Sequence, residues 1–115
     1  MWIFLSDAML SIVEDRDDPS CLVVRARLPG DIERTFPEAK IIELKERDYR
    51  FRAFLRRELV ADRVKKAVLD IRYGNFKDSV PDSARHDAYL GVWDVMHSAQ
   101  TDAERAEGAR HARQR

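Results

Sequence analysis

Alternation of apolar and polar residues is clearest between Cys21 and Leu28. In an extended chain, one face would carry Leu22, Val24, Ala26 and Leu28, and the opposite face would carry Val23, Arg25 and Arg27. Successive side chains of a β-strand point to opposite sides, so the pattern predicts a strand with a core face and an arginine-bearing face.

Three further runs of β-branched and aromatic residues predict strands. Residues 2–13 indicate one bent strand or two short ones with a break near Asp7, and the charged turn Glu14–Ser20 joins them to Cys21–Leu28. Lys40–Lys45 and Tyr49–Arg56 are expected to pair as a hairpin. Alternation in the second arm sends Tyr49 and Phe51 toward the core and puts Arg50, Arg52, Phe54 and Arg56 on the opposite face.

Helical spacing of apolar residues appears in two places. Residues 57–72 carry apolar side chains at intervals of three and four, which predicts a helix that packs on the sheet. Asp82 or Ser83 would cap a last helix that continues to about Gln100 and docks its apolar stripe on the domain. A short helix capped by Asp31 is expected to end at Phe36, before Pro37.

These elements predict an α+β fold with a four-stranded antiparallel sheet and helices on one face. The order resembles a ferredoxin-like sheet whose edge strand has moved to the N-terminus. Residues 1–100 would form a single domain. The tail 101–115 has no large apolar side chain, so we expect a frayed helix or disorder there.

Charge is abundant but balanced in this chain of 115 residues, with 21 Lys and Arg against 21 Asp and Glu. No global basic field would draw it to nucleic acid or to an acidic membrane. No apolar run approaches the length that crosses a bilayer, and the single cysteine excludes an internal disulfide. We therefore expect a cytoplasmic protein that does not bind membranes.

The arginine-bearing face of the two central strands is the first candidate binding site, formed by Arg25, Arg27, Arg50, Arg52, Phe54 and Arg56. Arginine and aromatic residues are enriched at interface hot spots, which favours a protein partner. A nucleic-acid-binding module could use the same face, although a single exposed ring is few for base stacking. The alternative is that this face binds no partner and is simply exposed to water, with Glu14 and Glu43 pairing with the arginines.

A second candidate is the loop site formed by Tyr73, Asn75, Phe76, Lys77, Asp78 and His86, residue types that active-site loops use. It supports the alternative of a small enzyme with its site near residues 75–89. The structural alternative is that Tyr73 and Phe76 fill a gap between helices. No nucleophile motif or glycine-rich phosphate loop is present, and Pro81 interrupts the spacing of Asp78, Asp82 and His86, so we predict no catalytic residue, metal or cofactor.

Several segments together resemble a family of small uncharacterised bacterial proteins. They include the opening Met1–Phe4, the run Asn75–Asp78 and the run Arg85–Trp93. The resemblance implies a bacterial, cytosolic, free-standing domain and carries over no functional residue. A domain of this size without catalytic motifs also fits an inhibitor of a larger macromolecular machine, for example one derived from phage. An exposed edge at Lys40–Lys45 leaves pairing with a second copy open.

Overall fold

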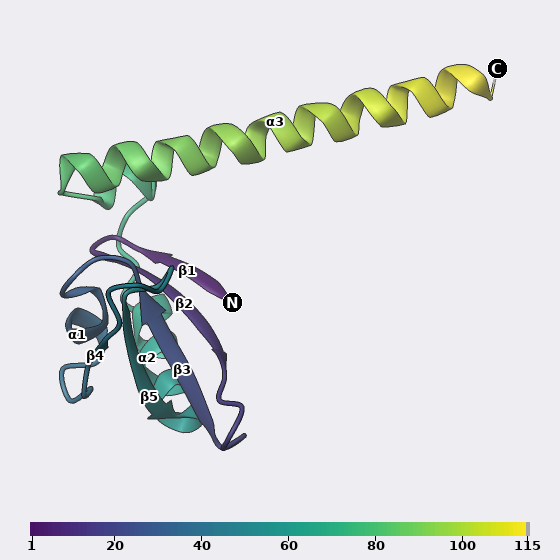
Figure 1. Cartoon of the computed structure of the whole chain (residues 1–115). Coiled ribbons are helices and arrows are strands. Elements are labelled where there is room, and N and C mark those ends of the chain that lie inside the picture. The colour runs from purple at the N-terminus through teal and green to yellow at the C-terminus, as the bar shows by residue number, and fades with distance from the viewer. Residues whose placement is uncertain (115) are drawn as a thin grey trace. The chain divides into compact units, whose positions relative to one another are not determined.

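A computed structural model describes residues 1–114 of the chain (Figure 1). Its contacts divide the chain into two compact units, Met1–Phe76 and Lys77–Arg115. The first unit contains the sheet and two helices, and the second contains a short 3-10 turn followed by one long helix. The prediction of a single domain over residues 1–100 stays a prediction.

The first unit is built on an open antiparallel sheet, so the chain belongs to the α+β class. The strands are β1 (Trp2–Leu5), β2 (Ala8–Glu14), β3 (Cys21–Ala26), β4 (Ile42–Glu43) and β5 (Phe51–Arg56). Their spatial order is β1-β2-β3-β5-β4, and each neighbouring pair is antiparallel. The expected count of four strands is therefore wrong, because the sheet has five.

The extra strand arises from the opening of the chain. Residues 2–13 fold as a hairpin, in which Leu5 lies opposite Ala8 across the two-residue turn Ser6–Asp7. A two-residue connection is the commonest way to join antiparallel strands. At the other edge, only Ile42–Glu43 of the expected strand Lys40–Lys45 pairs with β5, so β4 is very short.

Helices α1 (Asp31–Thr35) and α2 (Arg57–Leu69) complete the first unit. Gly30, not Asp31, is the N-cap of α1 and has a φ of 88°, in the left-handed region that favours glycine. The expected cap by Asp31 is thus wrong. Asp31 is instead buried, and its carboxylate accepts hydrogen bonds from the Met9 backbone N–H at 3.1 Å and from Arg34 Nη2 at 2.5 Å. These bonds tie α1 to the start of β2.

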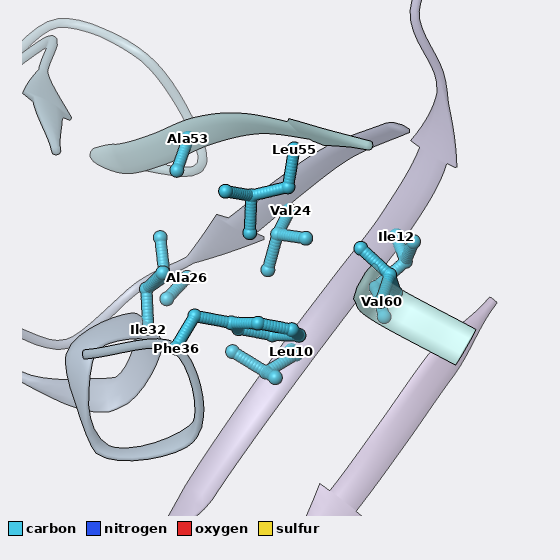
Figure 2. Close-up of a cluster of buried hydrophobic side chains, with 9 residues drawn as sticks. All are labelled: Leu10, Ile12, Val24, Ala26, Ile32, Phe36, Ala53, Leu55 and Val60. Carbon is cyan, nitrogen blue, oxygen red and sulfur yellow. The ribbon is translucent and has the colours of Figure 1, made fainter. Parts of the chain in front are cut away.

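The hydrophobic core lies on one side of the sheet, where both helices pack (Figure 2). Ile12, Val24 and Ala53 are direct neighbours across three strands and therefore share this face. Phe36 follows α1 and Val60 belongs to α2, and both are almost fully buried against these strands. The full cluster is Leu10, Ile12, Val24, Ala26, Ile32, Phe36, Ala53, Leu55 and Val60.

The second unit consists of η1 (Lys77–Ser79) and α3 (Ser83–Arg113). Asp82 caps α3, because its side chain accepts a hydrogen bond from the Arg85 backbone N–H at 2.9 Å. The helix continues past Thr101 to Arg113, where the sequence predicted fraying or disorder; residue 115 lies outside the described residues. No helix within residues 1–114 is long and apolar enough to span a membrane.

Candidate binding face

The side of the sheet opposite the core carries a continuous row of residues that includes two arginines and an exposed aromatic ring. Trp2, Ser11, Arg25, Arg52 and Ile42 are successive cross-strand partners from β1 to β4, so they share one face. The next row contains Val13, Val23 and Phe54, again as direct partners. We call these eight residues the open sheet face. Within it the indole of Trp2 and the ring of Phe54 are 68% and 49% exposed.

Arg25 and Arg52 lie opposite each other at the centre of the open sheet face. Arg25 donates from Nη2 to the Ser11 hydroxyl at 2.7 Å, and Arg52 donates from Nη2 to the Tyr49 carbonyl at 3.5 Å. Both guanidiniums are partly buried, and neither Nε has a hydrogen-bond acceptor within residues 1–114. No carboxylate among the described residues pairs with either arginine.

The opposed guanidiniums of Arg25 and Arg52 destabilise the folded chain when no anion is bound between them. Like charges directly opposite each other in a sheet repel, and partial burial removes some of the water that would screen them. A buried donor without an acceptor adds a further penalty. An anionic group placed against the exposed Nη atoms would reduce the repulsion, so the pair has the chemistry of an anion-binding site.

Tyr49 is buried, as expected, but it lies outside the main hydrophobic cluster and packs against arginines of this side of the sheet. Its buried ring lies beneath two guanidiniums, with the Cζ atoms of Arg25 and Arg27 at 4.5 and 4.2 Å from the ring centroid. The reason is that β5 begins only at Phe51, so the strand alternation does not extend back to Tyr49. The stacked ring holds both arginines by cation–π attraction.

Arg27 and Arg50 are each paired with a carboxylate. Arg27 Nη1 lies 2.6 Å from Asp48 Oδ1, and this hydrogen bond, with the Coulomb attraction, lowers the pKa of Asp48 below its ordinary value. The same contact raises the pKa of Arg27. Arg50 pairs with Glu43, as the solvated alternative expected, whereas Glu14 pairs with Arg57 of α2.

Arg56, at the end of β5, is exposed and lies 3.8 Å from the Glu58 carboxylate. Of the predicted binding residues, the structure therefore brings together Arg25, Arg52 and Phe54, with Arg27 beside them.

A shallow hollow of about 430 Å³ opens on the face over these residues. Phe54, Val13 and Val23 form its apolar part, and Arg25 and Arg52 lie in its wall. The turn after β2 contributes Glu14, Asp15, Arg16 and Asp17, and Arg47 completes the lining. The hollow can accept an apolar side chain next to an anionic group, with a mixed charge at its rim.

The loop site is distributed along the chain where the two units meet in sequence. The Tyr73 and Phe76 rings lie 5.7 Å apart and Asn75 is exposed, at the end of the first unit. In the second unit Lys77 Nζ lies 5.0 Å from the Trp93 ring centroid, Asp78 is exposed, and His86 Nδ1 is 3.3 Å from Asp87 Oδ1. Within residues 1–114 no three His, Cys, Asp or Glu side chains are grouped to hold a metal ion.

Trp2 is the functional candidate that sequence reasoning missed. Its place on the open sheet face follows from the register Trp2 opposite Ser11 and Ser11 opposite Arg25. The signal for this register was the two-residue break near Asp7, which sets the hairpin pairing.

Comparisons of the chain with protein-family models, with curated proteins and with solved structures find no match. The resemblance to a bacterial family stays a prediction.

Proposed function

We propose that this chain is a non-catalytic binding protein whose open sheet face receives an acidic and apolar segment of a partner protein. A carboxylate of that segment would sit against Arg25 and Arg52, and an apolar side chain would pack on Phe54 in the hollow. Bidentate pairing of arginine with carboxylate is among the stronger hydrogen-bonded contacts in proteins. An inhibitor that occludes a larger machine would be one form of this activity.

The observation that carries the proposal is the pair Arg25 and Arg52, which lie opposite each other on β3 and β5 and have no carboxylate partner in the part of the chain that the structure describes. Arg27, Arg50 and Arg57 each have such a partner. Among these arginines of the described chain, those without a carboxylate partner are therefore the two at the centre of the open sheet face. The exposed ring of Phe54, in the neighbouring row, supplies apolar area beside it.

The strand order β2-β3-β5-β4, with α1 after β3 and α2 after β5, supports a more specific description of the α+β fold. We infer a ferredoxin-like core with its edge strand moved to the N-terminus, extended by β1. In such a sheet the helices occupy one face and leave the other for ligands. This is an argument from fold and supports only the place of binding.

Binding of short labelled peptides, followed by fluorescence anisotropy, tests the proposal. The probes are a peptide rich in Glu and Phe, and a matched peptide with Lys in place of Glu. We expect binding of the acidic peptide alone, and a loss of about tenfold or more in affinity for the variant Arg25→Gln/Arg52→Gln. Arg105→Gln/Arg110→Gln removes the same charge from α3 and serves as the control. An equal loss in the control, or no preference for the acidic peptide, contradicts the proposal.

A second candidate is single-stranded nucleic acid, favoured by the two exposed rings of Trp2 and Phe54 on the arginine-bearing face. Stacking of bases on such rings, with phosphates on arginines, is a common binding mode. The balance of 21 Lys and Arg against 21 Asp and Glu opposes it, because a nucleic-acid strand presents a phosphate at every nucleotide, whereas the proposed peptide needs to place only one carboxylate between the arginines. Labelled DNA and RNA oligonucleotides in the same assay decide between the two: binding that weakens steeply with salt and requires Trp2 would replace the peptide proposal.

A further inference from the structure

Arg25 and Arg52 carry more hydrogen-bond donors than the chain around them uses. Each guanidinium has a fork of N–H donors and no acceptor of its own. Within residues 1–114, the Arg25 guanidinium has one acceptor, the Ser11 hydroxyl, and the Arg52 guanidinium has one, the Tyr49 carbonyl. The Nε atoms of both side chains are buried without an acceptor in the same part of the chain. The pair can therefore donate to a ligand that brings several acceptor oxygens.

The charge around Tyr49 is positive. Three guanidiniums gather there, since Arg25 and Arg27 stack on the Tyr49 ring and Arg52 donates to the Tyr49 carbonyl. Asp48 pairs with Arg27 and supplies one carboxylate. The charges of Arg25 and Arg52 remain in excess.

The other charged groups that line the hollow do not change this excess. Glu14 is already paired with Arg57 of α2. Two acids and two arginines make up the rest of the charged lining: Asp15, Asp17, Arg16 and Arg47. Because these four balance, the ligand has to neutralise the two central guanidiniums. A single carboxylate would neutralise one of them and leave the other without a counterion.

Apolar surface lies next to these charges. Phe54 and Val23 are cross-strand partners in the row adjacent to Arg25 and Arg52 on the same face, and rows on one face are about 6.6–6.8 Å apart along a strand. The Phe54 ring is half exposed and lines the hollow. An aromatic ring that packs on Phe54 can thus carry an anionic group to the two arginines within one side chain.

We propose that the segment bound by the open sheet face contains a phosphorylated tyrosine, with its phosphate between Arg25 and Arg52 and its ring on Phe54. A phosphate monoester carries a charge of about −1.5 to −2 at neutral pH and three strong acceptor oxygens. It therefore matches both the excess charge and the unused donors. Arginine is also the side chain whose planar fork suits phosphate geometry best. The inference rests on the proposed function and adds that phosphorylation of the partner switches binding on.

Four peptides of one neutral sequence test the match of charge by fluorescence anisotropy. They differ at a single position, which holds phosphotyrosine, sulfotyrosine, tyrosine or glutamate. The sulfate ester has the shape and the terminal oxygens of the phosphate ester but a single negative charge. At about pH 7.5, where the phosphate is mostly doubly charged, we expect the phosphopeptide to bind about fivefold or more tightly than the sulfopeptide. The glutamate peptide should bind more weakly than the phosphopeptide, and the tyrosine peptide weakest of all.

Single variants test whether both arginines produce the preference for phosphate. Arg25→Gln and Arg52→Gln should each bring the affinities for the phosphopeptide and the sulfopeptide close together, because one excess positive charge remains. Arg105→Gln removes the same charge from α3 and should leave the preference unchanged.

The natural chain alone can overturn the inference, so the test does not depend on how the variants fold. If both esters, or the phosphopeptide and the glutamate peptide, bind it equally and more tightly than the tyrosine peptide, the phosphate is not selected and the proposed function stands without this inference. If no anionic peptide binds, the proposed function itself fails.

A phosphoserine peptide tests the contact of the ring with Phe54. We expect it to bind the natural chain about two- to tenfold more weakly than the phosphotyrosine peptide, and we expect the difference to disappear in Phe54→Ala. Trp93→Ala removes a ring of similar exposure from α3 and should preserve the difference. Equal binding of both phosphopeptides to the natural chain would overturn the assignment to tyrosine.

Discussion

Asp48 is the residue at which ionisation can be followed most directly. It is exposed, yet its carboxylate holds Arg27 at 2.6 Å, and Arg27 in turn stacks on Tyr49. The contact therefore helps to fix the edge of the open sheet face although it lies in water. Because exposed ion pairs contribute little to stability, its main effect is on the position of Arg27.

The pH dependence of Asp48→Asn follows from the lowered pKa. In the unfolded chain Asp48 titrates near 3.8, and in the folded chain it titrates below that value because of Arg27. The stabilising contribution is thus complete above pH 3.8 and is lost as the pH falls through the folded pKa. We expect Asp48→Asn to lower the melting temperature slightly at neutral pH and not at all in stronger acid.

Glu46→Gln is the matched control for this measurement, since Glu46 is exposed, lies in the same turn and pairs with no cation among the described residues. Thermal unfolding of the three proteins across this pH range gives the comparison. A difference between the natural chain and Asp48→Asn that persists unchanged below pH 3.8 contradicts the assignment.

At the scale of elements, two glycines should respond in opposite ways to alanine, one at the N-cap of α1 and one inside α3. Gly30 begins α1 with a φ of 88°, and a Cβ there would meet Arg34 Nη1 at 2.8 Å. We expect Gly30→Ala to lower the free energy of unfolding by about 1–2 kcal/mol, the cost of the left-handed conformation for an L-residue. Gly91 lies inside α3 with open space around it, so Gly91→Ala should stabilise the helix by about 0.5–1 kcal/mol.

Urea unfolding of both variants tests the pair, with the slope of the transition as a check that the unfolded state is unchanged. If Gly30→Ala proved as stable as the natural chain, the left-handed start of α1 would be incorrect.

Elements with a strict local pattern could be predicted from the sequence. The alternation of β3 and β5 placed Val24, Ala26 and Ala53 in the core, and the spacing in α2 placed Val60 there. The start of α1 could not be predicted, because both Gly30 and Asp31 suit that position and the choice depends on the contact of Asp31 with Met9. The length of β4 depends on its partner strand and has no local signal.

The candidate site was predictable to the same extent. Alternation put Arg25, Arg52 and Phe54 on one face, and the structure brings them together. Tyr49 could not be placed, since it precedes the strand and its position depends on stacking with Arg25 and Arg27. The pairing of each arginine with a carboxylate also depends on the conformation of the turns, which the alternation of apolar and polar residues does not determine.

At the scale of the whole molecule, protection against hydrogen exchange should differ sharply between the two units. The amides of Val24 and Ala53 lie in central strands beneath a packed core, whereas those of Ser98 to Ala109 lie in a helix with exposed side chains. We expect the α3 amides to exchange far faster than those of β3 and β5. Mass spectrometry of exchange measures both regions in one experiment. Equal protection would mean that α3 is held within the monomer.

The position of β3 in the sheet has a consequence for synthesis on the ribosome. One edge of β3 pairs with β2, which precedes it directly, but the other pairs with β5, which follows only after residues 27–50. The nascent β1-β2-β3 meander therefore has an open edge, lined by Leu22 and Val24, until Arg56 has left the exit tunnel. An open apolar edge attracts other strands. Translation pauses that leave β3 outside the tunnel while β5 is still inside it should consequently increase aggregation of the chain, and pauses after β5 has emerged should not.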